Sequence, residues 1–219
     1  MKRLAVLISG RGSNLDALLS AIQRHGWPIA VVAVISNRPN APGLKIARAN
    51  GIATEVLDHT QFQNRKAFDA ALAQKLETQS PDLVALAGFM RLLTAEFCAR
   101  FRNRLVNIHP SLLPAFKGLE THQQALDAGV RVHGCTVHLV TAELDHGPIL
   151  AQAIVPVHPD DTAEVLAARV LKMEHEIYPT AIAAWLSGQL MIQDDRIINR
   201  GEGAFPTEFR SCRLHPDLA

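Results

Sequence analysis

Lys2–His25 carries the sequence KRLAVLISGRGSNLDALLSAIQRH, and this stretch decides the fold. Its first residues, up to Ser9, form an apolar run that predicts a buried β-strand. Leucine and isoleucine then recur with helical spacing from Asn14 to His25, and a loop with two glycines separates the two patterns. A strand, a glycine loop and a helix in this order predict the opening unit of an α/β fold.

The same alternation of strand and helix continues through the first half of the chain. Further strands are predicted at Ile29–Ser36, Ala53–Leu57, Asp82–Ala87 and Leu105–Ile108, and further helices at Gly43–Asn50, Arg65–Thr78 and Thr94–Phe101. This order is typical of an α/β, Rossmann-like fold, in which helices cover both faces of a mostly parallel sheet. Ligands bind such sheets beyond the carboxyl ends of the strands. The loops after the first, fourth and fifth strands are therefore the candidate binding loops.

The second half of the chain has a different pattern, with fewer and longer elements. The predicted elements are a helical or loop-like segment at Gly118–Gly129, strands at His133–Thr141 and Pro148–Val157, a helix at Thr162–Trp185 and a strand pair near Leu190–Ile198. Thr121 is expected to cap the first of these and Gly129 to stop it, while Thr162 opens the long helix. The ends of the remaining tail are expected to fray.

Composition and charge narrow the function classes. The chain has 219 residues, 48% of them hydrophobic, with 22 basic against 21 acidic residues and no long run of either sign. A dedicated duplex-binding surface is not expected from this balance. The longest apolar runs have the length of strands and are too short to cross a bilayer, so a soluble, cytoplasmic protein with no membrane or nucleic-acid partner is expected. The three cysteines lack the spacing of a disulfide framework or a zinc knuckle, and Cys135 is expected to be a small buried thiol.

The loop Ser9–Asn14 has the composition of an anion-binding loop. Its glycines let backbone N–H groups approach an anion, and the following helix offers the positive end of its dipole. Ser13 or Asn14 is a candidate cap of that helix, and a tight turn with no ligand is the alternative interpretation. Leu15 stands where a dinucleotide fingerprint needs a third glycine, and no acidic residue ends the second strand, so a phosphate monoester on a small molecule fits better.

A second candidate site lies at the end of the fifth strand, in the run Asn107–Pro114. Period-two alternation points Asn107 and His109 the same way, and Pro110 ends the strand because it has no N–H. Asp145 is a candidate carboxylate partner that would favour the charged imidazole of His109. An amide, an imidazole and a carboxylate without a serine or cysteine nucleophile favour acyl transfer by direct attack of a substrate amine.

Other interpretations of these residues remain open. Zinc binding is disfavoured because the histidines and the carboxylate here form no tight ligand pair of the H-E-x-x-H kind: His109, His122, His133, His138 and Asp145. Ser111 lacks the nucleophile elbow of hydrolases, and Asp145 can also be a simple turn residue before Gly147. The loop Ala87–Leu93 either lines a pocket for a flat aromatic ligand or packs against an ordinary helix.

Several motifs in one order resemble the phosphoribosylglycinamide formyltransferase family. The resemblance spans about Leu4 to Trp185 and rests on five stretches: Ile8–Asn14, Leu86–Arg91, Asn107–Pro114, Glu143–Asp145 and Glu174–Pro179. It implies a transferase of de novo purine biosynthesis and one-carbon metabolism, with a formyltransferase fold. The formyl group of the cosubstrate 10-formyltetrahydrofolate would pass to the amine of 5-phosphoribosylglycinamide, and no metal is needed.

The resemblance also implies roles for individual residues. Asn107, His109 and Asp145 would form the formyl-transfer site, with His109 as proton donor, Asn107 as oxyanion partner and Asp145 as the carboxylate that tunes His109 and helps relay the amine proton. Glu174 would contact the ribonucleotide, and Gly12, Ser13 and Asn14 its phosphate. The folate pocket would be lined by Arg65, Met90, Arg91, Leu92, Leu93, Asn107, Thr141, Ala142, Glu143, Leu144 and Asp145.

The resemblance implies one catalytic domain at 1–190, with a phosphate-binding half at 1–100 and a folate-binding half at 101–190, followed by a tail at 191–219. The enzyme would be a monomer or a homodimer. Departures from the family pattern are His146 in place of a glycine and Cys135 in place of a threonine, and Ala115–Gly118 fits a mobile substrate loop. Methionyl-tRNA formyltransferase, formyltetrahydrofolate hydrolase and a non-catalytic nucleotide-binding module are the competing functions.

Overall fold

The computed structural model describes residues 1–194, 196–205 and 210–218. The chain folds into two compact units, the first made of Met1–Asn107 with Val140–Ala142 and the second of Ile108–Leu139 with Glu143–Ala219. The division falls after Asn107, whereas the family resemblance implies halves that meet after residue 100, and the described part of the tail at 191–219 belongs to the second unit. No helix of the described residues is both long enough and apolar enough to cross a membrane.

The first unit is built on a parallel sheet whose central strand is β1 (Lys2–Ile8). β2 (Ile29–Ser36) and β4 (Leu83–Leu86) pair with its two sides, β3 (Thr54–Val56) pairs with β2, and β5 (Leu105–His109) pairs with β4 through its first three residues. The strand order reverses between β1 and β4, which is where ligands bind in open parallel sheets. The predicted α/β fold with a mostly parallel sheet is confirmed.

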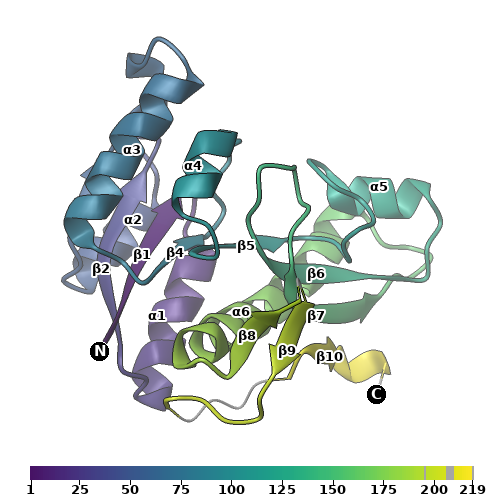
Figure 1. The fold of residues 1–219 in the computed structure, drawn as a ribbon. Helices are drawn as coiled ribbons and strands as arrows, with labels where there is room; N and C mark the ends of the chain where they lie inside the picture. Colours follow the sequence, from purple (N-terminus) through teal and green to yellow (C-terminus); the bar gives the residue numbers. More distant parts are fainter. Residues whose placement is uncertain (195, 206–209, 219) are drawn as a thin grey trace. The chain divides into compact units, whose positions relative to one another are not determined.

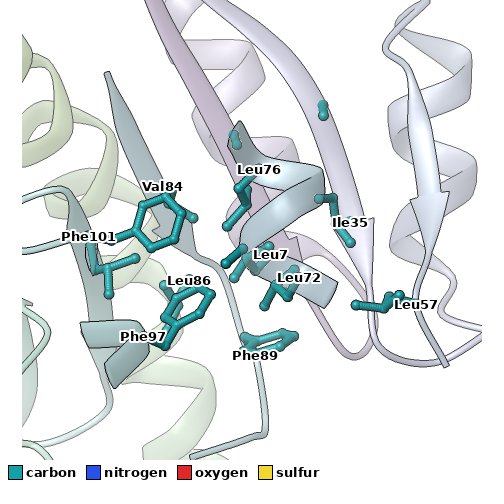
Figure 2. Packing of buried hydrophobic residues seen from close by; sticks show 14 of the residues in the cluster. Leu7, Ile35, Leu57, Leu72, Leu76, Val84, Leu86, Phe89, Phe97 and Phe101 are labelled. Carbon is teal, nitrogen blue, oxygen red and sulfur yellow. The ribbon is translucent and has the colours of Figure 1, made fainter. Parts of the chain in front are cut away.

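Helices cover both faces of this sheet, as its apolar strands require. α3 (Arg65–Gln79) and α4 (Ala95–Arg100) lie over one face, and α1 (Ser13–His25) and α2 (Gly43–Ala49) complete the unit (Figure 1). The core under α3 and α4 is seen in Figure 2, where strand, loop and helix side chains interlock: Leu7, Ile35, Leu57, Leu72, Leu76, Val84, Leu86, Phe89, Phe97 and Phe101. Burying each such side chain contributes roughly 1.5–3 kcal/mol.

The predicted cap of α1 is wrong. The N-cap is Gly12, in the left-handed region with φ 81°, and no side chain caps the helix there, so neither Ser13 nor Asn14 has that role. The reason is a close approach of two backbones: a Cβ on Gly12 would lie 2.6 Å from the Cα of Gly43, at the start of α2. Gly12 therefore serves both the turn and the packing of α1 on α2.

The second unit holds a smaller sheet and the longest helix. β6 (Val132–Leu139) is antiparallel to β7 (Ile149–Pro156), and β10 (Cys212–Leu214) runs parallel to β7 on its other edge. α5 (Thr121–Asp127) precedes this sheet, and α6 (Ala163–Ser187) follows it and is continuous through Pro179. β8 (Leu190–Gln193) and β9 (Arg196–Asn199) form the predicted strand pair.

Two expectations for this unit are wrong and one cap is confirmed. The tail contains a strand, β10, where only frayed ends are predicted. Thr121 is the first residue of α5 rather than its cap, because its hydroxyl donates to the carbonyl oxygen of Pro110 at 2.6 Å, and the N-cap is Glu120. Thr162 does cap α6, accepting from the backbone N–H of Val165 at 3.3 Å.

Candidate functional site

His109 and Asp145 are brought together in the second unit. His109 ends β5 and is buried, and its Nδ1 lies 3.5 Å from Oδ2 of Asp145. Asp145 lies in the turn between β6 and β7, with φ 45°, a left-handed conformation that aspartate adopts more readily than most residues. Both side chains are less than a tenth exposed, so little solvent screens their interaction.

A second imidazole faces the same carboxylate. Nε2 of His138, on β6, lies 4.0 Å from Oδ1 of Asp145, and Nδ1 of His138 donates to the carbonyl oxygen of Leu139 at 3.0 Å. Burial lowers the pKa of His138, which is therefore neutral near pH 7. Asp145 thus lies between a buried, neutral imidazole and the imidazole of His109.

The segment after β5 makes backbone hydrogen bonds to both His109 and Asp145. The backbone N–H of Gly118 donates to Oδ2 of Asp145 at 2.9 Å, and Nε2 of His109 lies 3.0 Å from the carbonyl oxygen of Phe116. Because a carbonyl oxygen only accepts, Nε2 carries the proton in this contact. His109 therefore has a hydrogen-bond donor at Nε2 and the carboxylate of Asp145 beside Nδ1. This arrangement suits donation of a proton from Nε2 to a ligand atom that takes the place of the Phe116 carbonyl oxygen.

Sequence reasoning missed the part that Phe116 and Gly118 play, because their backbone atoms make the contacts. Gly118 gives a partial signal, because a glycine after a proline-bounded run indicates a tight turn. In the structure φ is 52° at Phe116 and 83° at Gly118. The aromatic ring of Phe116 packs edge-on against His133 at 5.8 Å between ring centroids. This contact holds the segment against β6.

His122 and His133 form a buried pair beside this segment. Their rings meet edge-on at 5.3 Å, and His133 is fully buried. Burial, with a further contribution from the charge of His122, lowers the pKa of His133 to about 4, and burial also lowers the pKa of His122. In the described parts of the chain, no three His, Cys, Asp or Glu side chains are grouped to hold a metal ion.

The predicted phosphate loop lies in the first unit, at the end of β1. Gly12 precedes α1, Ser13 is the first helical residue, and Asn14 is buried. The N–H groups of the first helical turn have no partner within the helix and can bind an anion. Asn107, on β5, is the remaining member of the predicted catalytic set, and strand alternation puts its side chain on the same face as that of His109.

The predicted folate loop follows β4 and is only partly packed. Met90 and Leu92 are 63% and 50% exposed, although both are apolar. Between them, the Arg91 guanidinium lies over the ring of Phe68 at 4.6 Å, and Leu93 packs against the core. Exposed apolar side chains at a strand's carboxyl end suit a flat ligand better than a helix contact.

The other predicted folate residues come from two places in the chain. In the first unit, Arg65 is exposed at the start of α3, and the carbonyl oxygen of Thr141, which precedes Ala142, accepts from the Cys98 thiol at 3.4 Å. In the second unit, Leu144 is 49% exposed, and Glu143 forms an exposed ion pair with His146 at 3.2 Å. His146 therefore pairs within the turn that carries Asp145.

Glu174 is buried on α6, in the second unit. Tyr178 lies one helical turn further on, and Cys135 lies on β6. Their own burial is the largest cause that raises the pKa of each, and the charge of Glu174 is the second. Cys135 is fully buried, as the sequence predicts, and its raised pKa keeps the thiol protonated.

Comparison with known proteins matches the chain to one family. The family model described as formyl transferase matches residues 2–182. Phosphoribosylglycinamide formyltransferase of Escherichia coli (strain K12) is 46% identical over 192 residues, which cover 88% of this chain and 91% of that protein. The chain also matches the trifunctional purine biosynthetic protein adenosine-3 of Bos taurus at 47% identity, where the match spans 19% of that longer protein.

Solved structures agree with the sequence comparison. The crystal structure of glycinamide ribonucleotide transformylase 1 from Symbiobacterium toebii has a TM-score of 0.88 and 50% identity, covering 91% of this chain and 94% of that one. A formyltetrahydrofolate deformylase from Pseudomonas syringae pv. tomato is more distant, at 26% identity and a TM-score of 0.83, and the match covers 90% of this chain and 65% of that one. The chain therefore belongs to the formyl transferase family, and its predicted place among the phosphoribosylglycinamide formyltransferases is confirmed.

Proposed function

We propose that this protein transfers the formyl group of 10-formyltetrahydrofolate to the amine of 5-phosphoribosylglycinamide, in purine biosynthesis. The observation that carries the proposal is the buried pair of His109 and Asp145, whose side chains lie 3.5 Å apart at the end of a strand. The kinship with phosphoribosylglycinamide formyltransferases supports the choice of the two substrates. The phosphate of the ribonucleotide binds Gly12, Ser13 and Asn14 in this proposal, and Glu174 contacts the rest of that substrate.

The chemistry follows from the donors and acceptors of these side chains. The amine nitrogen attacks the formyl carbon, and the carbonyl electron pair moves to oxygen, where the amide of Asn107 donates a hydrogen bond. The oxygen's electron pair then re-forms the carbonyl as the bond from carbon to N10 of the folate breaks, and N10 takes the proton from His109. The attacking amine gives up its proton toward Asp145, which restores the charge balance of the pair. No covalent enzyme intermediate forms.

The folate is proposed to lie against the exposed apolar loop at Met90–Leu93 and the segments that carry Arg65, Asn107 and Thr141–Asp145. Binding there requires Nε2 of His109 to leave the carbonyl oxygen of Phe116, 3.0 Å away, and face N10. The segment that holds Phe116 therefore has to shift when both substrates bind.

A direct assay tests the proposal. The protein is mixed with 10-formyltetrahydrofolate, with and without 5-phosphoribosylglycinamide, and deformylated folate is measured. Product that depends on the amine is expected, and equal turnover without it would assign the chain to the deformylase reaction instead. His109→Ala should lower kcat by about 100- to 10,000-fold, because a positioned general acid contributes that much, while substrate dissociation constants stay nearly the same. His158→Ala, at an exposed histidine, is the matched control.

A further inference from the structure

Ser9 is a buried residue at the junction of the two candidate binding loops of the first unit. It follows β1 directly, opens the loop Ser9–Asn14, and is only 3% exposed. Its backbone N–H donates to the carbonyl oxygen of Gly88 at 3.1 Å, and its hydroxyl oxygen accepts from the backbone N–H of Met90 at 2.8 Å. Ser9 thus makes two hydrogen bonds to the backbone just where the predicted folate loop begins.

The hydroxyl of Ser9 has one possible arrangement of its proton. Its O–H donates to Oδ1 of Asn37 at 2.5 Å, and this uses its single proton. The N–H of Met90 therefore donates to a lone pair of the same oxygen, so both contacts are satisfied together. A side chain with no hydroxyl loses both bonds at once.

Asn37 is itself held in place, which fixes the direction of the Ser9 hydroxyl. Asn37 follows β2, is 2% exposed, and its carbonyl oxygen lies 2.9 Å from Nδ1 of His59. Its side-chain nitrogen lies 3.2 Å from the same ring nitrogen, but that nitrogen already donates its proton to the backbone carbonyl oxygen, so His59 holds Asn37 through the backbone. The resulting chain of polar contacts runs from His59 through Asn37 and Ser9 to Met90, and all its members belong to the first unit.

We propose that Ser9 is a positioning residue that couples the phosphate loop to the folate loop, so that each substrate raises the affinity of the protein for the other. The proposal rests on the function proposed above, which assigns the phosphate to Gly12, Ser13 and Asn14 and part of the folate to Met90–Leu93. An anion drawn onto the N–H groups after Ser9 orders the end of β1, and the two bonds from Ser9 order the backbone of Gly88–Met90. By thermodynamic reciprocity, folate bound at Met90 orders the phosphate loop by the same factor.

The test measures this coupling directly, with ligands that do not react. Tetrahydrofolate, the deformylated product, is titrated into the full chain with and without saturating 5-phosphoribosylglycinamide, and the ratio of the two dissociation constants is the coupling factor. The wild-type protein is expected to give a factor of about five or more. Ser9→Ala should bring the factor within twofold of one. A loss of stability alone does not change this ratio, because both titrations use the same folded variant.

Two further variants complete the design. Ser36→Ala removes another fully buried serine hydroxyl, which bonds only to the backbone of Arg38, and it should keep the wild-type coupling factor. Asn37→Ala removes the acceptor of the Ser9 hydroxyl but leaves the bond from Met90, so it should reduce the logarithm of the coupling factor by about half. This variant provides a second measurement if Ser9→Ala does not fold. Coupling that persists in both Ser9→Ala and Asn37→Ala, or in whichever of them folds, overturns the proposal. A wild-type protein that binds neither ligand overturns the proposed function as well, so the two failures are distinguishable.

Discussion

His133 makes the stability of this protein sensitive to mild acid. Its side chain is fully buried on β6, and burial lowers its pKa from 6.5 to about 4. Between these two values the unfolded chain binds a proton that the folded chain does not, so the folded state loses stability as the pH falls from about 6.5 towards 4. From pH 6.5 to pH 5 the free energy of unfolding falls by about 1.36 kcal/mol for each pH unit. Over about 1.5 units this group therefore costs roughly 2 kcal/mol.

The measurement is the free energy of unfolding by urea at pH 7 and pH 5, for the wild-type protein and for His133→Phe. The variant keeps an aromatic ring between Phe116 and His122 but cannot take up the proton. Its loss of stability between the two pH values should be about 2 kcal/mol smaller than that of the wild type. His158→Gln, which removes an exposed histidine, should behave as the wild type does. Equal losses in the wild type and in His133→Phe would refute the reasoning, whatever the stability of the variant at pH 7.

Three further outcomes are expected. Gly12→Ala should lower the free energy of unfolding by at least about 2 kcal/mol, since its Cβ meets a backbone atom at 2.6 Å and φ is 81°, whereas Gly10→Ala, with open space around it, should change it little. Arg169→Ala should cost roughly 2 kcal/mol and raise the lowered pKa of Asp161, because it removes a nearly buried ion pair, and acid titration of the variant would show this. A thiol reagent should label one cysteine per native chain, Cys212, and two more after unfolding; fast labelling of all three would contradict the burial of the other two.

Much of the fold could be predicted because its signals are local. The strands of the first unit are continuous apolar runs, and α1 and α3 begin within one residue of their predicted starts. The sequence offers Asp145 as a candidate carboxylate partner of His109, and the two side chains do lie 3.5 Å apart. Their catalytic roles stay predictions until the variants are assayed.

The features that could not be predicted depend on contacts between distant backbones. Gly43 is in a helix, where glycine is usually unfavourable, and a Cβ there would lie 2.8 Å from the side chain of Ile8 and 3.0 Å from the Cα of Gly12, so no side chain fits. Phe116 and Gly118 act through a backbone carbonyl and a backbone N–H, which nearly every residue type carries, so beyond the turn that Gly118 indicates their identities do not predict these contacts. β10 has three residues, too few for a periodic pattern, and it forms because β7 offers a free edge.

That short strand matters for anyone who shortens or extends the chain. β10 pairs with Gln152, Ala153 and Ile154, and two flanking backbone bonds, from Gln152 to Ser211 and from His215 to Ile154, extend the contact. A version of the protein that stops before Ser211 leaves this side of β7 with unpaired N–H and C=O groups, and such an edge recruits strands from other molecules. A shortened protein that lacks these last residues is therefore expected to aggregate more than the full chain does. Light scattering during concentration would reveal the difference.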